Sequence, residues 1–436
     1  MKFTKESLIV GFALFALFFG AGNLILPPFL GFFAGTKWYL VAFGFALSAV
    51  GLPLLGIFAH ARIQGSIFNF ADKVSPVFSI IYSFLIYLIS VSLPAPRTAA
   101  VTHEIAVQPF FDVSALTTSI IYFALVFLFV IKRSSVINNI GKYLTPAILI
   151  LLSAIIVSGI FSENIPMGDS LTELPVLYGF FEGYQTFDAI AALVVGGVII
   201  VSVKLKGHTS TREIRSIIST AAIIAALGLF FVYGGLIYNG AIVASEFHSG
   251  ITRTQLLSGI SLLNLGSIAQ TSLAILVALA CFTTAVGIIT GTADFMAERI
   301  KKPFVYPITV ILSCMLGIVM GALSVNKIIE IALPVLMLIY PLTICLILLN
   351  VLPESLRTKL IMRAAVIATI LFSLPDALQY IVTPALFENV KDQIPLAHYG
   401  LGWVLPMLAT FFLAVLFSKK KSLTSRKVRD LKSIFF

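Results

Sequence analysis

Charge is the property that this sequence has least of. Only 11% of its 436 residues are charged, with 29 lysines and arginines against 19 aspartates and glutamates. An ordinary soluble domain carries about 25% charged residues, because a folded chain in water needs a polar exterior. Hydrophobic residues make up 59% of the chain. These figures exclude a soluble enzyme and a disordered protein, and they indicate an all-α polytopic membrane protein.

Cysteine and histidine are also scarce. The three cysteines, Cys281, Cys314 and Cys345, all fall inside apolar runs, so no disulfide framework is expected. The five histidines show no metal-ligand spacing. The nucleotide-binding pattern G-x-x-x-x-G-K-[ST] and the hydrolase patterns G-x-S-x-G and H-E-x-x-H are missing. The sequence therefore predicts neither an ATP-driven pump nor an enzyme.

What the chain does contain is a series of apolar runs, each of a length suited to a transmembrane helix of about 20 residues. The first run is too long for the core of a typical signal peptide, so we expect it to be a membrane span. Twelve runs are recognised, near 8–33, 38–60, 76–102, 118–131, 143–161, 177–203, 216–239, 266–296, 303–325, 328–352, 361–383 and 400–418. A short extra helix is possible within the loop 240–265.

The basic residues predict the orientation of these spans. With the N-terminus in the cytoplasm, 24 of the 29 lysines and arginines fall in inside segments, four fall outside, and Arg97 lies within a span. Cytoplasmic loops carry this excess in membrane proteins. Both termini are therefore expected to be cytoplasmic, and the basic tail 419–436 is expected to face lipid. The net charge of +10 then reflects orientation and predicts no nucleic-acid partner.

The first span is interrupted near its midpoint. The segment Gly20–Asn23 contains two glycines and a polar amide, and Pro27-Pro28 follows it, which is costly in a continuous helix. Unpaired backbone groups are tolerated in a membrane only where they line a cavity or are buried in protein. We expect a discontinuous helix whose inner half ends near Phe19 and offers carbonyls to a cation. Its outer half would begin near Asn23 and offer N–H groups to an anion. The alternative is close helix packing on small residues.

A second interruption is predicted in the sixth span. Gly179–Asp188 is polar and contains glycines, and the apolar run Ala189–Val203 that follows is short for a full span. Spans one and six are five helices apart, which is the spacing of a five-helix repeat inverted in the membrane plane. The sequence predicts a single transport domain with repeat one at 8–161, repeat two at 177–352, and accessory helices at 361–418.

The eighth span carries hydroxyls near its middle. Ala280, Thr283 and Thr284 share one helix face, so one carbonyl and two hydroxyls could complete an oxygen cage for a small hard cation. Sodium fits such a cage better than a divalent ion, since the cage has no carboxylate of its own. The alternative is that the threonines bond back to their own helix.

Four motifs together resemble the bacterial branched-chain amino acid carriers, the BrnQ or LIVCS family. They are Phe15-Ala-Leu-Phe-Phe-Gly-Ala-Gly-Asn-Leu-Ile-Leu-Pro-Pro28, Pro94-Ala-Pro-Arg-Thr98, Gly183-Tyr-Gln-Thr-Phe-Asp188 and Cys281-Phe-Thr-Thr-Ala-Val-Gly287. The resemblance implies import of leucine, isoleucine and valine with a cation, usually sodium, across a bacterial inner membrane. It also implies the LeuT-type fold with helices 1 and 6 broken, no covalent cofactor and no obligate protein partner.

The LeuT-type resemblance also implies roles for individual residues. The amides of Ala21 and Gly22 would hold the substrate carboxylate, and Asn23 with Thr186 would form a second sodium site where one exists. The implied substrate set is Gly20, Ala21, Gly22, Asn23, Thr186, Phe187 and Asp188, and the implied sodium set is Ala16, Phe19, Ala280, Thr283 and Thr284. The arginine that follows the motif in neurotransmitter-type carriers is absent here, where Leu26 precedes Pro27. Their outer gate cannot therefore be copied.

Six charges lie within or at the edge of spans: Arg97, Glu182, Asp188, Asp294, Glu330 and Asp376. Each is expensive in lipid and should face protein or water. Our hypothesis is that Arg97 pairs with Glu182 or Asp188 as an outer gate, the alternative being a static ion pair. Asp188 is the best candidate for coupling or for contact with a substrate amine. We expect Asp294 to snorkel or to pair with a basic loop residue, and Asp376 to be structural, while Glu330 lies at the outer end of the tenth span.

The side-chain pocket has to be apolar for these substrates, and Tyr87, Phe187 and Val286 are candidates by position only. The sequence thus predicts a sodium-coupled symporter. A proton-coupled carrier using Asp188 or Glu182, a non-transporting amino acid sensor and a channel are the alternatives.

Overall fold

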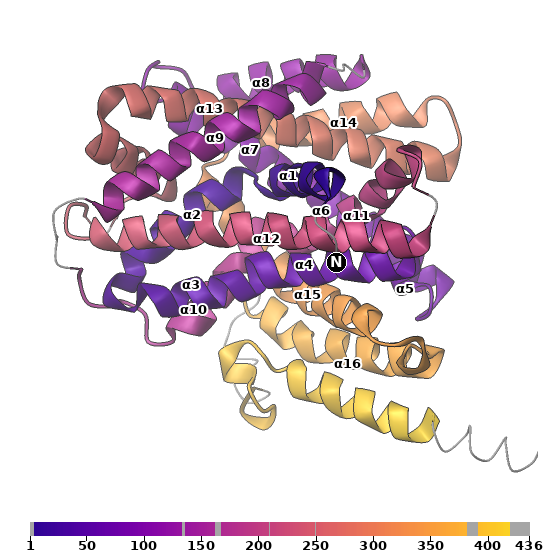
Figure 1. The fold of residues 1–436 in the computed structure, drawn as a ribbon. Helices are drawn as coiled ribbons and strands as arrows, with labels where there is room; N and C mark the ends of the chain where they lie inside the picture. The colour runs from indigo at the N-terminus through magenta and orange to yellow at the C-terminus, as the bar shows by residue number, and fades with distance from the viewer. Residues whose placement is uncertain are drawn as a thin grey trace, which may run out of the picture. The chain divides into compact units, whose positions relative to one another are not determined.

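The computed structural model describes residues 4–132, 136–161, 167–208, 210–248, 250–381 and 391–418, which form helices and no strand. The all-α prediction is therefore confirmed, while the predicted basic tail lies outside the described residues. The helices labelled in Figure 1 and the short turns between them are, in chain order, α1 (Lys5–Phe18), α2 (Ala21–Ala34), η1 (Gly35–Lys37), α3 (Trp38–Ala46), η2 (Leu47–Gly51), α4 (Leu52–Ile63), α5 (Ile67–Ala71), α6 (Pro76–Ser92), α7 (Pro94–Thr102), η3 (His103–Val107), α8 (Ala115–Ile131), α9 (Val136–Ile160), α10 (Pro175–Glu182), η4 (Gly183–Thr186), α11 (Asp188–Leu205), α12 (Thr211–Ile242), α13 (Arg253–Ile300), α14 (Val305–Gly321), α15 (Val325–Val351), η5 (Glu354–Leu356), α16 (Lys359–Leu378) and η6 (Ala397–Tyr399).

The predicted apolar runs coincide with these helices, and the last run contains the helix Val404–Ser418. Among the described residues, six helices are long and apolar enough to cross a membrane alone. The bent pair Pro175–Thr186 and Asp188–Lys204 makes a seventh. Several other runs form shorter apolar helices or helices in two pieces, so the count of twelve crossings stays a prediction.

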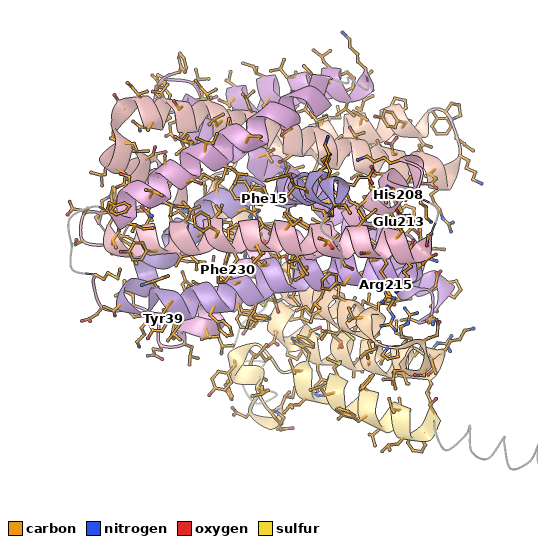
Figure 2. The ribbon with its side chains drawn as sticks, viewed as in Figure 1. Phe15, Tyr39, His208, Glu213, Arg215 and Phe230 are labelled. Carbon is orange, nitrogen blue, oxygen red and sulfur yellow. The ribbon has the colours of Figure 1, made fainter. Side chains whose placement is uncertain are left out.

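The helix α12 illustrates how the outer surface suits a membrane. Figure 2 labels His208, Glu213 and Arg215 near its N-terminal end and Phe230 along its length. Phe230 leaves 56% of its surface exposed, as does Tyr39 on α3. Large apolar side chains exposed in such numbers are unfavourable in water but not in hydrocarbon. The charged end of α12 is where the sequence predicts the cytoplasmic boundary.

Contacts divide the chain into two compact units. The first comprises Met1–Leu54, Phe84–Ala191 and Thr220–Ala332, and the second comprises Leu55–Ser83, Ala192–Ser219 and Leu333–Phe436. Each unit therefore combines segments from both expected repeats. In the second unit, the buried ring of His60 lies between the carbonyls of Leu193 (2.8 Å) and Gly65 (3.1 Å).

In the first unit, α10 packs on α3, and α13 packs against α2, α7 and α9. The long helix α13 is interrupted at Gly266, whose φ of 78° and ψ of −174° are accessible to glycine but not to other residues without strain. Its first part, from Arg253 to Gly266, is the extra helix that the sequence allowed in the loop 240–265. Its second part is the predicted eighth span.

Small residues allow α2 to approach α12 closely. A Cβ atom at Gly31 would overlap the carbonyl of Ile237, and one at Gly240 would overlap the carbonyl of Pro28. Packing on small residues therefore operates in the outer part of the first span. It does not replace the helix break, which occurs earlier in the same span.

Candidate substrate and cation site

The first span is broken at Phe19 and Gly20, as predicted. Phe19 has φ −80° and ψ 84°, and Gly20 is extended with φ −104° and ψ −173°. The N–H of Gly20 donates to Phe18 O at 2.9 Å, so it leaves the helical pattern in which it would donate to Ala16 O. The inner helix therefore presents its last carbonyls at the break.

The outer half begins at Ala21, two residues before the predicted Asn23. The N–H of Asn23 donates to Gly20 O at 3.1 Å, which closes the first turn. Pro27 and Pro28 lie inside α2 and do not end it. Their missing N–H groups remove only the bonds to the carbonyls four residues earlier, while their fixed φ suits a helix.

The sixth span is broken as well, and its two helical parts differ in direction by 45°. Phe187 sits at the bend in a left-handed conformation with φ 63°, which is a strained choice for a bulky residue. Thr186 fixes the bend, since its Oγ1 donates to Gly183 O (2.8 Å) and accepts from Asp188 N (3.3 Å). Asp188 is then the first residue of α11.

The two breaks meet through a buried polar network. Asn23 Nδ2 donates to Asp188 Oδ2 at 2.6 Å and also contacts the hydroxyl of Tyr233. Tyr233 Oη donates to the same carboxylate oxygen at 3.3 Å. All three side chains are at most 2% exposed. The structure thus brings Asn23 and Asp188 together and adds Tyr233 from α12, which the sequence reasoning missed.

Of the predicted sodium ligands in the eighth span, Thr284 lies near the first break. A Cβ atom at Gly20 would be 3.8 Å from Cγ2 of Thr284, because α13 packs on α2. Thr283 Oγ1 donates to Ala280 O at 3.0 Å. This bond is expected if Thr283 only hydrogen-bonds within its own helix. It also holds the hydroxyl of Thr283 beside the carbonyl of Ala280, and both are proposed ligands.

Arg97 lies beside both breaks. Its Nη1 donates to Gln185 O at 2.6 Å, and its Cζ is 5.2 Å from the ring centroid of Phe187. A Cβ atom at Gly22 would overlap Nη2 and lie 2.8 Å from Cζ. The guanidinium is also close enough to Asp188 for an electrostatic interaction. The predicted pairing of Arg97 with Asp188 stays a prediction.

Glu182 takes a different partner from the one predicted. Its Oε2 forms an ion pair with Nη2 of Arg253 at 3.4 Å, at the start of α13. Arg253 also donates to Asn326 Oδ1 (3.0 Å) and stacks over Phe29 at 4.3 Å. The prediction that Arg97 is the partner of Glu182 is corrected, because the first helical part of α13 brings a second arginine over the end of α10.

A second acidic group lies at the same end of α13. Glu104 accepts hydrogen bonds from Thr254 Oγ1 (2.6 Å) and from Val325 N (2.8 Å). Together with Arg253, it ties the start of α13 to η3, α10, α2 and α15. We call Glu104, Glu182, Arg253, Thr254 and Asn326 the α13 latch.

Of the other three charges in or near the spans, Glu330 and Asp376 have partners away from the two breaks. Glu330 is exposed and pairs with Lys327 at 2.7 Å, and Asp294 is exposed. Asp376 is buried in the second unit, 3.9 Å from Lys391.

Two of the three predicted pocket residues have structural partners. Tyr87 stacks on Phe295 with ring centroids 4.0 Å apart. Val286 belongs to a hydrophobic core formed by α7, α8, α13 and α14. Phe187, in contrast, lies at the bend beneath Arg97.

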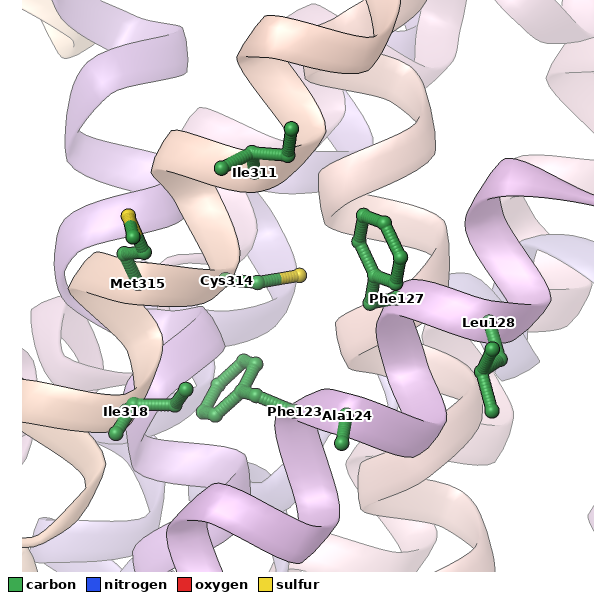
Figure 3. Close-up of a pocket in the computed structure, with 8 residues that line it drawn as sticks. All are labelled: Phe123, Ala124, Phe127, Leu128, Ile311, Cys314, Met315 and Ile318. Carbon is green, nitrogen blue, oxygen red and sulfur yellow. The ribbon is translucent and has the colours of Figure 1, made fainter.

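An apolar groove of about 400 Å³ lies between α8 and α14 (Figure 3). It is lined by Phe123, Ala124, Phe127, Leu128, Ile311, Cys314, Met315 and Ile318. None of these is a predicted site residue. Apolar side chains offer no hydrogen bonds with which to hold an amino acid head group. Among the described residues there is also no cluster of three or more histidines, cysteines and acids that could hold a transition metal.

Comparison with known proteins agrees with the motifs. Residues 3–421 match the family described as branched-chain amino acid transport protein. The chain is 35% identical over 417 residues to the branched-chain amino acid permease BraB of Bacillus subtilis, covering 92% of this chain and 93% of the permease. It is 34% identical over 424 residues to the branched-chain amino acid transport system 2 carrier protein of Pseudomonas aeruginosa, covering 94% and 95%.

Solved structures share the fold at low sequence identity. The nucleobase-cation-symport-1 family transporter Mhp1 has a TM-score of 0.60 at 14% identity, covering 95% of this chain and 93% of Mhp1. A Na⁺-coupled sialic acid symporter has a TM-score of 0.58 at 11% identity, covering 94% and 90%. These are LeuT-fold transporters, and the family and its named relatives are carriers rather than enzymes. The chain therefore belongs to the branched-chain amino acid transport protein family, and it has the LeuT-like fold that its sequence predicted.

Proposed function

We propose that this protein is a sodium-coupled symporter that imports leucine, isoleucine and valine by alternating access. The observation that carries the proposal is the meeting of the two helix breaks, where Asn23 of α2 bonds to Asp188 of α11. Free helix ends offer N–H groups to a carboxylate and carbonyls to a cation at one place. An amino acid presents both charges on one carbon, so this site suits its head group.

The coupling ion in this proposal binds between α1 and α13. Its ligands are the carbonyls of Ala16, Phe19 and Ala280 and the hydroxyls of Thr283 and Thr284. The packing of α13 on α2 supports this assignment, because a Cβ atom at Gly20 would lie 3.8 Å from the methyl carbon of Thr284. An ion held there stabilises the broken helix in the form that binds substrate. Sodium and substrate then each raise the affinity of the other, and this coupling is reciprocal.

The topology in this proposal is that of a bacterial inner-membrane protein with both termini in the cytoplasm. Repeat one at 8–161 and repeat two at 177–352 form the transport core, and the helices of 361–418 are accessory. The α13 latch closes the outer side of the site. Arg253 and Glu104 support this role because they tie the start of α13 to α2, α10, η3 and α15.

The double variant Thr283→Ala with Thr284→Ala tests the sodium site. We expect it to remain in the membrane and to lose sodium-stimulated leucine uptake, since two oxygen ligands are removed. Uptake of labelled leucine at several sodium concentrations is the measurement.

The matched control is Thr292→Ala. Thr292 is a buried threonine of the same helix whose Oγ1 donates to Ile288 O at 2.8 Å. Its loss should leave the sodium dependence unchanged. A double variant with the sodium dependence of the unmodified protein would remove this site from the account.

A proton-coupled carrier is the second candidate, because Asp188 is a buried acid at the point where the two broken helices meet. Replacing sodium with choline at fixed pH separates the two. Uptake that persists in choline and follows an inward proton gradient would favour Asp188 as the coupling group.

A further inference from the structure

Gln185 is a buried amide whose polar atoms have no hydrogen-bond partner. It belongs to η4, inside the break of the sixth span, and is 1% exposed. Neither its Nε2 nor its Oε1 has a partner among the described residues. An amide left unsatisfied in the interior costs free energy that an apolar residue of the same size would not. Such a group needs a ligand or a water to account for it.

The main chain of the same residue is held by Arg97. The guanidinium donates to Gln185 O at 2.6 Å and rests against Gly22 in the first turn of α2. Arg97 is itself only 3% exposed. The unsatisfied amide therefore belongs to a residue in direct contact with a buried cation, beside the helix end expected to bind an anion.

The side-chain amide of glutamine has donors and an acceptor that complement the carboxylate and ammonium of an amino acid head group. Its NH₂ carries two donors and its carbonyl oxygen accepts. A substrate carboxylate can accept from Nε2, while the substrate ammonium can donate to Oε1. A guanidinium prefers carboxylates because its fork of N–H donors matches their two oxygens.

We propose that Gln185 and Arg97 bind the head group of the transported amino acid, Arg97 at the carboxylate and the Gln185 amide bridging carboxylate and ammonium. This inference rests on the proposed function and names a substrate contact within it. It makes Gln185 a specificity residue for α-amino acids, since a ligand without the ammonium leaves Oε1 unsatisfied.

The test uses purified full-length protein and the variant Gln185→Met, which has a similar length and no hydrogen-bonding amide. Binding of leucine and of 4-methylpentanoate, which lacks the ammonium, is measured by calorimetry together with the melting temperature without ligand. We expect leucine affinity to fall about 10- to 100-fold, as for the loss of hydrogen bonds to charged groups. The preference for leucine over 4-methylpentanoate should fall as well, while the melting temperature is kept or raised.

Ser83→Ala is the matched control. Ser83 is fully buried and its Oγ also has no partner in the part of the chain that the structure describes, but it lies in the second unit. Its substitution should leave leucine affinity within twofold. If Gln185→Met does not fold, Gln185→Glu keeps the acceptor and places a negative charge against the carboxylate, so it should weaken leucine binding more than tenfold.

Three outcomes distinguish a failure of the proposed Gln185 contact from a failure of the proposed function. If the unmodified protein binds leucine and the folded variant binds it equally well, the amide is satisfied by water and this inference is wrong. If both ligands lose affinity equally, the assignment of Oε1 to the ammonium is overturned. If the unmodified protein binds no branched-chain amino acid, the proposed function itself fails.

Discussion

Asp188 is where the two broken helices and α12 converge on a single oxygen atom. Oδ2 accepts from Asn23 Nδ2 and from Tyr233 Oη, and neither donor comes from its own helix. Such a shared acceptor fixes the relative position of the elements that carry the donors, because buried hydrogen bonds to a charged group are costly to leave unmade. Asp188 therefore links the two broken helices to α12 through its carboxyl group.

Tyr233→Phe should weaken substrate binding without removing the protein from the membrane. The substitution keeps the ring and removes the hydroxyl that holds Asn23 and Asp188. A hydrogen bond to a charged group is worth about 1.5–3 kcal/mol, so we expect the KM for leucine to rise by at least tenfold. Uptake kinetics at saturating sodium measure this change.

Tyr82→Phe is the control for that substitution. Tyr82 is a buried tyrosine whose hydroxyl bonds to Thr343 Oγ1 at 2.8 Å in the second unit. We expect a loss of stability without a change in KM. Equal KM values for the two variants would contradict the role given to Tyr233.

Local sequence was enough to identify some site residues and not others. Gly20–Asn23 and Gly179–Asp188 could be recognised because glycine and polar residues are anomalous within an apolar span. Tyr233 could not, since a tyrosine in a membrane helix looks like any other and its partner is 210 residues away. Gln185 was read only as part of a motif, because an unsatisfied amide is a property of the fold.

Among the helices, the start of α13 has the contacts that a moving gate requires. The α13 latch joins α13 to α10 through Glu182, to α15 through Asn326 and to η3 through Glu104. Polar and ionic contacts of this kind can break and re-form, whereas a packed apolar interface resists separation. In the proposed mechanism, some of these contacts open to admit substrate to Asn23.

Linking Arg253 to Glu182 covalently should therefore stop transport. The two positions are changed to cysteine in a chain lacking Cys281, Cys314 and Cys345, and a short thiol-reactive linker joins them. We expect leucine uptake to fall at least tenfold and to recover when the linker is cleaved by reduction.

Lys327→Cys with Glu330→Cys is the matched pair for this experiment. These residues pair at 2.7 Å within the single helix α15, so a link between them restrains no movement between helices. Uptake should continue after linking. If the Arg253–Glu182 link also leaves uptake intact, the latch is a static contact.

The element pattern was largely predictable, and its exceptions have physical causes. The breaks in spans one and six lie at the glycine-containing segments that predicted them, whereas Pro27 and Pro28 lie inside α2 and do not cause a break. Of the two partners predicted for Arg97, Glu182 is paired with Arg253 instead. The loop helix that carries Arg253 folds over α10, and no sequence pattern within a span reports such a contact.

For the whole molecule, the scarcity of charge and its uneven distribution along the chain are typical of a polytopic membrane protein. Only six of its 48 charged residues lie within or at the edge of predicted spans, and the chain belongs to a family of branched-chain amino acid transport proteins. In the proposed function, the protein accumulates substrate by coupling its import to an ion gradient. The sodium gradient is the proposed source, acting at the junction of α1 and α13.

Uptake of labelled leucine into proteoliposomes containing only this protein tests that claim most directly. With an inward sodium gradient, the account predicts that leucine rises transiently above its external concentration, and that isoleucine and valine compete with it. Without the gradient, uptake should stop at equilibrium. Leucine that never exceeds the external concentration under a sodium gradient would contradict sodium-coupled import by this chain.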